Sequence, residues 1–164
     1  MMKSHKSFQK IFLLVFLVLG GIKGGYAAED PVHGGGPLGL GVEYGYPGNW
    51  GVVGNLWLTY KDSLQPAVKF EDGGQAILQL DYLWHNYHVF HVRSGELPIY
   101  IGLGGDITLT DPASMAVRVP IGLSYIFGHG TPLDIYAQVV PTVWFVTNNS
   151  SFHLYGNVGI RIYP

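Results

Sequence analysis

The last third of the chain, from Ile99 to Pro164, alternates between two kinds of residue with a period of two. One set of alternate positions has no charged residue: Ile99, Ile101, Leu103, Gly105, Ile107, Leu109, Val117, Val119, Ile121, Leu123, Tyr125, Phe127, Leu133, Ile135, Ala137, Val139, Pro141, Val143, Phe145, Phe152, Leu154, Gly156, Val158, Ile160 and Ile162. The intervening set includes Asp106, Arg118, Ser124, Asp134, Gln138, His153, Asn157 and Arg161. Successive side chains of a β-strand point to opposite faces, so this pattern predicts strands with one apolar and one polar face.

The same alternation, less regular, extends through the first half of the chain and gives eight predicted strands. They are Leu38–Gly45, Trp50–Lys61, Leu64–Glu71, Gln75–His85 (with a possible extension toward His91), Pro98–Thr110, Met115–Phe127, Leu133–Phe145 and Phe152–Tyr163. The segments between them are short and rich in Gly, Pro, Asn, Asp and Ser, which favours turns. Because short turns leave no room for crossovers, the prediction is an antiparallel meander. Pro66, Pro120 and Pro141 each remove a ladder hydrogen bond and predict a bulge or strand end.

The N-terminal segment has the features of a secretory signal peptide. Lys3, Lys6 and Lys10 precede the uninterrupted apolar run Ile11–Leu19, and Gly25-Tyr26-Ala27 fits a signal-peptidase site. We therefore predict a signal peptide over residues 1–28, a flexible lead-in over 29–36 and one barrel domain over 37–164. The alternative for the first segment is an uncleaved anchor, although the apolar run is shorter than the roughly 20 residues of a spanning helix.

Cleavage would leave an acidic chain. Four of the nine Lys and Arg residues lie within the predicted signal, whereas all eleven Asp and Glu residues lie at or beyond Glu29. An acidic surface argues against nucleic acid as a partner. The chain has no cysteine, which excludes a disulfide scaffold. Charged residues make up 12% of the chain, against about 25% in ordinary soluble domains.

Two architectures fit eight meandering strands. A soluble lipocalin-like carrier would put the apolar face inside, whereas a transmembrane barrel would put it against lipid. The polar face of the last four strands has no Lys or Glu and contains many glycines and aromatics, unlike a surface in water. Aromatic residues also fall near strand ends in the apolar register, where membrane barrels place their girdles: Tyr44, Trp50, Tyr60, Tyr82, Trp84, Tyr125 and Phe145. The sequence therefore favours an all-β, eight-stranded, antiparallel up-and-down transmembrane barrel.

The charged residues in the inward register form the candidate site. They are Glu43, Lys69, Glu71, Asp81, Asp106, Arg118, Asp134 and Arg161. Because an unpaired buried charge is costly, we expect ion pairs, with Arg118 opposite Asp106 or Asp134 and Arg161 opposite Asp134 or Glu43. The network can either fill the barrel as a plug of salt bridges or act as a selectivity element in a narrow, weakly cation-leaning pore.

No motif predicts catalysis, a metal or a cofactor. His85, His88 and His91 recur every third residue, so on a strand they alternate faces and do not converge on one ion. The lipid A deacylases have a His and a Ser two residues apart on an outward strand face, but His153 is followed by Leu154 and Tyr155. No Ser, His and acid combination has a usable spacing either, so the prediction is a protein without enzymatic activity.

Four segments together resemble one known family. They are Leu80-Asp81-Tyr82-Leu83-Trp84-His85-Asn86-Tyr87, Leu97-Pro98-Ile99-Tyr100-Ile101-Gly102-Leu103-Gly104-Gly105, Arg118-Val119-Pro120-Ile121-Gly122-Leu123-Ser124-Tyr125 and Gly159-Ile160-Arg161-Ile162-Tyr163. The chain from Gly39 to Tyr163 resembles the small outer-membrane β-barrel family first described from spirochaetes, which is similar to the OmpA membrane domain. The resemblance implies an eight-stranded membrane barrel with no cofactor, and it offers no catalytic residue.

The combined expectation is a bacterial outer-membrane protein with a structural or surface-scaffold role. Its termini would lie in the periplasm, and Asp111–Ser114 and Thr147–Ser151 would be displayed at the cell surface. Its partners would be outer-membrane lipid and, during biogenesis, the barrel assembly machinery. Such barrels usually end on an aromatic residue that this machinery recognises, whereas this chain ends Tyr163-Pro164.

Overall fold

The computed structural model describes residues 31–32, 35–71, 75–109, 113–128, 130–146 and 149–164. The predicted signal peptide over residues 1–28 lies outside these ranges, as do Asp111, Pro112, Thr147 and Asn148 of the two predicted surface loops. Within the described ranges, no helix is both long and apolar enough to cross a membrane.

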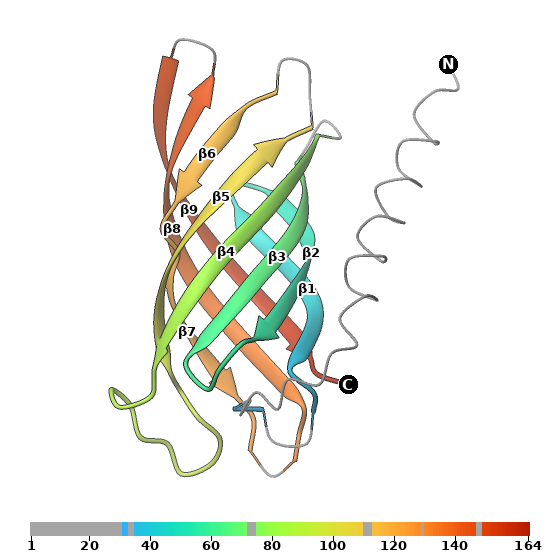
Figure 1. The fold of residues 1–164 in the computed structure, drawn as a ribbon, viewed down its shortest axis with the longest axis vertical. Helices are drawn as coiled ribbons and strands as arrows, with labels where there is room; N and C mark the ends of the chain where they lie inside the picture. Colours follow the sequence, from blue (N-terminus) through green and yellow to red (C-terminus); the bar gives the residue numbers. More distant parts are fainter. Residues whose placement is uncertain (1–30, 33–34, 72–74, 110–112, 129, 147–148) are drawn as a thin grey trace, which may run out of the picture.

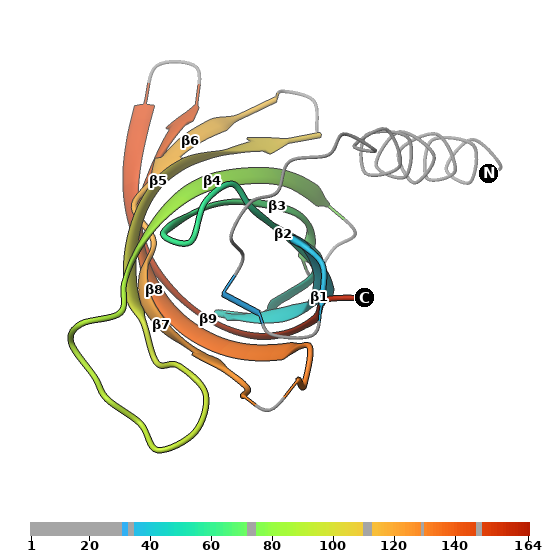
Figure 2. The same cartoon turned by 60° about the horizontal axis from the view of Figure 1, so that its bottom comes forward.

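The described residues form nine strand segments in one antiparallel sheet (Figure 1). The segments are β1 (Leu38–Tyr46), β2 (Asn49–Trp57), β3 (Asp62–Glu71), β4 (Ala76–Asn86), β5 (Ile99–Thr108), β6 (Met115–Arg118), β7 (Ile121–Ile126), β8 (Leu133–Val146) and β9 (Asn149–Ile162). Neighbours along the chain pair with one another, except β6 with β7, and β1 also pairs with β9, so the sheet closes on itself. Figure 2, turned to look toward one end, shows the resulting ring of strands.

Segments β6 and β7 are two halves of one barrel strand. Both lie between β5 and β8, and the ladder is interrupted at Val119 and Pro120. Backbone hydrogen bonds still connect this interruption to both neighbouring strands. Gly102 N of β5 donates to Pro120 O at 2.8 Å, and Val119 N donates to Pro141 O of β8 at 3.0 Å. The barrel therefore has eight strands, which confirms the predicted fold class.

The prolines interrupt ladders where the sequence predicts it. At the β6–β7 break, Pro141 of β8 lies opposite Val119, and Pro120 is the next residue along the interrupted strand. The β2–β3 register runs from Asn49↔Glu71 to Val53↔Ala67 and resumes at Leu56↔Leu64, so it skips Pro66 and Gln65. Each proline lacks the N–H that a ladder bond needs, yet Pro66 still pairs with Leu80 of β4, and Pro141 with Leu154 of β9.

Strand parity separates two environments. The uncharged register faces outward on every strand, and its exposed members include Leu40, Val42, Trp50, Leu80, Trp84, Ile101, Leu103, Val117, Ile121, Ile135, Val139, Phe152, Leu154, Val158 and Ile160. The polar register faces inward, and Glu43, Asn55, Gln65, Lys69, Asp81, Asp106, Arg118, Ser124, Asp134, Gln138, Asn157 and Arg161 are buried there. This is the reverse of a soluble barrel, which would bury its apolar face.

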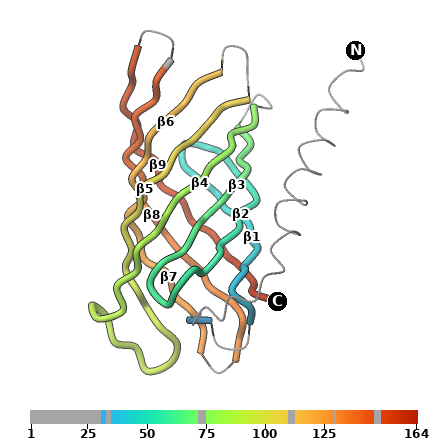
Figure 3. The backbone as a smooth tube through the Cα atoms, in the orientation of Figure 1, coloured from blue at the N-terminus to red at the C-terminus, as the bar shows by residue number. Residues whose placement is uncertain are grey.

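The ends of the barrel differ. The start of β1, the end of β9 and the connection between β4 and β5 lie at one end, called here the terminal end (Figures 1 and 3). Strand β4 stops at Asn86 and does not continue toward His91. At the opposite end, called the far end, the β8–β9 hairpin stands higher than the β1–β2 hairpin (Figure 3). The far end therefore has an uneven rim.

Candidate functional site in the barrel lumen

The charge cluster nearest the terminal end joins Arg161 to Asp134. The two residues are register partners on β9 and β8. The Arg161 guanidinium donates through Nε to Asp134 Oδ1 at 2.9 Å and through Nη2 to Asp134 Oδ2 at 2.7 Å. Arg161 Nη1 also donates to Gln65 Oε1 at 2.8 Å, and the Tyr163 hydroxyl donates to Asp134 Oδ2 at 2.9 Å. Every strong donor of the arginine thus has a buried acceptor, which is what makes the burial of its charge tolerable.

A second cluster surrounds Glu43 on β1. Lys69 Nζ lies 2.5 Å from Glu43 Oε1, and the Tyr136 hydroxyl donates to Oε2 at 2.7 Å. The Asn157 amide, oriented by its neighbours, accepts from Lys69 Nζ and from Gln138 Nε2, each at 3.1 Å. The Tyr100 hydroxyl donates to Gln138 Oε1 at 2.9 Å, which extends the network across the lumen.

A third cluster gathers two carboxylates around Arg118 of β6. Its Nε lies 3.1 Å from Asp81 Oδ1, and its Nη1 donates to both carboxylate oxygens of Asp106 at 3.1 Å. Gln79 links the cluster, because its Oε1 accepts from Arg118 Nη1 at 2.6 Å and its Nε2 donates to Asp81 Oδ2 at 2.8 Å. Two acids on one arginine leave this cluster with a negative formal charge.

The structure thus brings seven of the eight candidate residues into three ion-paired clusters. Glu71 is the exception. It ends β3 at the far rim and is half-buried, and it makes no ion pair with any described residue. Arg161 pairs with Asp134 and not with Glu43, because Lys69 already neutralises Glu43.

The neutral members of the clusters were not among the predicted site residues, although Gln138 was placed in the polar register. Hydrogen bonds to the charged groups come from Gln65, Gln79, Gln138, Tyr136 and Tyr163. The inward register would have found all five, since each has the same strand parity as the charges. The plane of Tyr136 also lies under Arg161, with the guanidinium carbon 4.3 Å from the ring centroid.

Buried apolar side chains also lie inside the barrel beside these clusters. At the terminal end, Val32, Trp57, Ile126 and Tyr163 form one buried group with Tyr87 packed against it. A second group of Ile77, Ala116 and Trp144 lies toward the far end. Trp144 Nε1 donates to the Tyr155 hydroxyl at 3.1 Å.

Four residues of the predicted flexible lead-in, which spans residues 29–36, are described: 31, 32, 35 and 36. Val32 is only 1% exposed and packs with Trp57, Ile126 and Tyr163. Gly35 N donates to Val32 O at 3.3 Å, and Gly36 N donates to Pro164 O at 3.1 Å, so Gly36 is bonded to the last residue of the chain. Val32 thus occupies an apolar site beside Trp57 and Tyr163, called here the seat of Val32. The glycine-rich composition of the segment did not predict this contact.

Of the three spaced histidines, His85 lies on the inward face of β4, whereas His88 and His91 lie beyond the end of β4, in its connection to β5. His85 is buried, with its ring 4.6 Å from that of Trp57 and 5.2 Å from that of Tyr100, whereas His88 and His91 are exposed. His85 Nδ1 lies 3.1 Å from Lys61 O. Among the described residues, no group of three His, Cys, Asp or Glu side chains could hold a metal ion. Tyr163, the terminal aromatic, is fully buried in the lumen.

Comparison with protein-family models and with curated protein sequences finds no match. Among solved structures, the chain is similar to the N-terminal β-barrel domain of Pseudomonas aeruginosa OprF, with a TM-score of 0.51 and 14% identity. The similarity covers 76% of this chain and 95% of that domain. At this identity the likeness shows a shared fold, so the chain has an OmpA-like eight-stranded barrel, and the resemblance to the spirochaete family stays a prediction.

Proposed function

We propose that the chain is an integral outer-membrane barrel whose closed lumen gives it a structural or surface-scaffold role and no enzymatic activity. One observation carries the proposal. The outward register of the described strands is free of charge, apart from Asp62 at the start of β3, while the charged side chains of the inward register, except Glu71, are paired inside. An outward apolar band with a polar interior is the arrangement that lipid demands of a barrel.

The placement of the apolar face weighs against a soluble carrier. A lipocalin-like protein would need its large apolar side chains inside, around a ligand cavity, and its charges in water. Here Trp50, Trp84 and Phe145 are about half exposed, with values of 58%, 47% and 50%. In water such a surface would aggregate, whereas in a bilayer it is the contact surface.

The buried groups inside the barrel weigh against the pore alternative. Ions would have to pass the apolar group around Val32 and Trp57 as well as the Arg161–Asp134 pair. An eight-stranded barrel has an interior that side chains can fill completely. The proposal is therefore a barrel that presents short hairpins at its far end to the outside and does not conduct.

The proposed setting follows from the same reasoning. Residues 1–28 would direct export and be removed, and the assembly machinery would insert the barrel with its terminal end in the periplasm. Membership of the spirochaete-type family is the finer part of the proposal, and it rests on the four sequence segments alone. No cofactor or nucleic acid is part of the proposed function.

Cell fractionation tests the membrane assignment. The mature protein should partition with outer membranes and migrate faster on gels when unheated, as folded membrane barrels do. A protein recovered in the soluble periplasmic fraction, with one mobility heated or unheated, would mean that the soluble carrier is correct.

Planar-bilayer recording separates the scaffold from the pore. Refolded wild type should give no reproducible conductance steps. Steps that change in size with Arg118→Ala or Asp134→Ala would establish a pore lined by these residues and would overturn the closed-lumen proposal.

A further inference from the structure

The barrel wall has a notch at the far end, between the β1–β2 hairpin and β9. Strand β9 pairs with β8 along its whole length, from Asn149 to Ile162. It pairs with β1 only from Gly156 onward, because β1 ends at Tyr46. The edge of β9 from Asn149 to Tyr155 therefore has no strand partner on the β1 side, and the higher β8–β9 hairpin is visible in Figure 3.

The open edge lies at the level of outward apolar side chains. Phe152 and Leu154 are 68% and 61% exposed and continue the outward register of Val158 and Ile160 on the same strand. Their register partners on β8 are Val143 and Pro141. Hydrocarbon cannot satisfy unpaired backbone N–H and C=O groups, so an edge at this level needs a hydrogen-bonding occupant.

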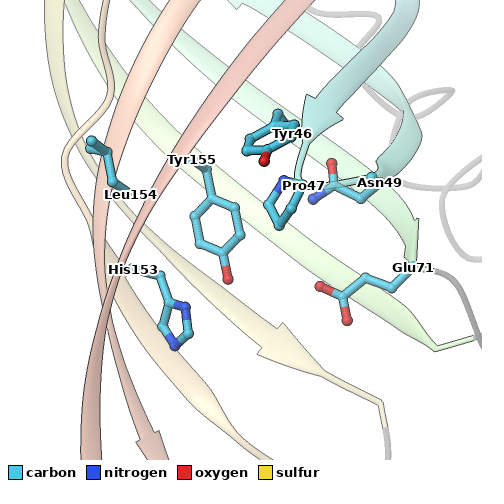
Figure 4. A pocket seen from close by; sticks show the side chains of 8 residues that line it. Tyr46, Pro47, Asn49, Glu71, His153, Leu154 and Tyr155 are labelled. Carbon is cyan, nitrogen blue, oxygen red and sulfur yellow. The ribbon is translucent and has the colours of Figure 1, made fainter.

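A hollow of about 390 Å³ opens at this edge (Figure 4). Its lining consists of Tyr46, Pro47, Gly48, Asn49, Glu71, His153, Leu154 and Tyr155. Tyr46 and Leu154 belong to the outward register, whereas Asn49, Glu71, His153 and Tyr155 belong to the inward one. The hollow is therefore lined by residues of both registers, with polar inward residues on one side and apolar outward residues on the other.

The polar side of the hollow has one fixed charge, the carboxylate of Glu71. Figure 4 shows this carboxylate directed into the hollow, facing Tyr155 and His153. His153 stacks on Tyr155 with ring centroids 6.0 Å apart, and its Nε2 lies 3.1 Å from Ser151 Oγ. The lining has no Lys or Arg, so the hollow favours an occupant that brings a positively charged donor.

A second copy of the chain does not fit this edge. Two β9 edges paired antiparallel are related by a two-fold axis perpendicular to the sheet, and that operation turns the second barrel upside down in the membrane. Copies inserted from the same side all have one orientation. A strand from another protein could pair with the β9 backbone. It would not cover the outward side chains of Phe152 and Leu154 with hydrocarbon, as a lipid does.

We propose that the notch binds one phospholipid with a primary ammonium headgroup, of the phosphoethanolamine class. The inference rests on the proposed membrane location of the barrel. The ammonium group donates to Glu71, the neutral donors Asn49 and Tyr155 border the phosphate, and the acyl chains lie over Phe152 and Leu154. A phosphocholine headgroup has the same charge but no N–H donor, which provides a matched comparison.

Lipid binding to the refolded full chain in neutral micelles, measured by native mass spectrometry, tests the headgroup assignment. With identical acyl chains, the phosphoethanolamine lipid should bind about tenfold more tightly than the phosphocholine lipid, because it adds one charge-assisted hydrogen bond. Glu71→Gln should remove this preference, whereas Asp62→Asn at the terminal end should keep it. Equal affinity for both lipids, a preference that survives Glu71→Gln, or tighter binding of a neutral glycolipid would overturn the proposal.

Cysteine labelling in vesicles separates this proposal from the membrane assignment on which it rests. The chain has no cysteine, so Phe152→Cys and Val143→Cys each give one labelling position, and the two positions are register partners. In phosphocholine vesicles, a water-soluble maleimide should label position 152 and leave position 143 protected, and phosphoethanolamine lipid should slow labelling at 152 several-fold. Protection at 152 without amine lipid, or no slowing with it, overturns the notch proposal alone. Free labelling at both positions would overturn the membrane location as well.

Discussion

Arg161 and Asp134 are joined twice, once by the sheet and once by their side chains. They face each other as register partners on β9 and β8, and the guanidinium and carboxylate form a two-bond pair at 2.9 and 2.7 Å. Because the pair is buried, water cannot solvate either charged group if its partner is removed. The pair therefore ties the last strand of the barrel to its neighbour close to the point where the sheet closes.

Replacing Asp134 should show how much this pair matters. Asp134→Asn keeps the shape of the side chain but leaves the Arg161 charge without its anion, and removing one partner of a buried pair costs about 3–5 kcal/mol. The free energy of unfolding, measured by urea titration in lipid vesicles, should fall by about this amount. Asp62→Asn, whose carboxylate lies in the exposed β2–β3 turn, should stay near wild type. A loss of equal size in both variants would contradict the role of the pair.

A charge placed on the outward register should oppose insertion. Leu80 lies in the middle of β4 and is 53% exposed, so Leu80→Arg should destabilise the inserted barrel by about 2–4 kcal/mol. Leu58 is also exposed but lies in the turn after β2, where arginine should cost about 0–1 kcal/mol. Folding yield into vesicles, followed by the gel mobility of unheated samples, measures the difference. Equal yields for the two variants would mean that Leu80 does not face lipid.

A glycine beneath Tyr136 should tolerate no side chain. A Cβ at Gly159 would lie 2.5 Å from the Tyr136 ring, whose hydroxyl is bonded to Glu43. Gly159→Ala should therefore displace the ring and cost about 1–3 kcal/mol of unfolding free energy, as overpacking of a filled interior does. Gly156 is the matched control on the same strand, since its Cβ would meet no atom within 4 Å. Urea titration of both alanine variants should show a loss for position 159 alone.

Truncation of Val32 should loosen the terminal end without unfolding the barrel. Val32→Ala removes apolar contact from the group with Trp57 and Tyr163, so amide exchange at Gly35 and Gly36 should become faster while strand amides stay protected. Val89→Ala, at a position that is 46% exposed, should leave exchange in this segment unchanged. Identical exchange in both variants would mean that Val32 does not hold the segment in place.

Most of the fold could be predicted from the alternation of apolar and polar residues. Because a strand turns every second side chain to the same face, the parity of Asp106, Arg118, Asp134 and Arg161 predicted which residues share the lumen. Pro120 marked the place where one strand divides into β6 and β7. The two-residue period is a local property, so these features needed no knowledge of distant neighbours.

The selection of partners could not be predicted in the same way. Parity places Glu43 and Arg161 on one face, but it does not say that Lys69 from β3 occupies Glu43 first. That outcome depends on the stagger of the strands around the closed barrel, which a single strand does not encode. The seat of Val32 was also hidden, because it is built from residues of β2, β7 and the chain end.

The seat of Val32 has a consequence for the order of assembly. Its wall includes Tyr163, and Gly36 N donates to the carbonyl of Pro164, so one of the earliest described segments is held by the last two residues of the chain. Such a seat cannot exist on a nascent chain that lacks its final strand. Burial of Val32 and addition of β9 to the barrel are therefore coupled, and a buried Val32 reports that β9 is in place.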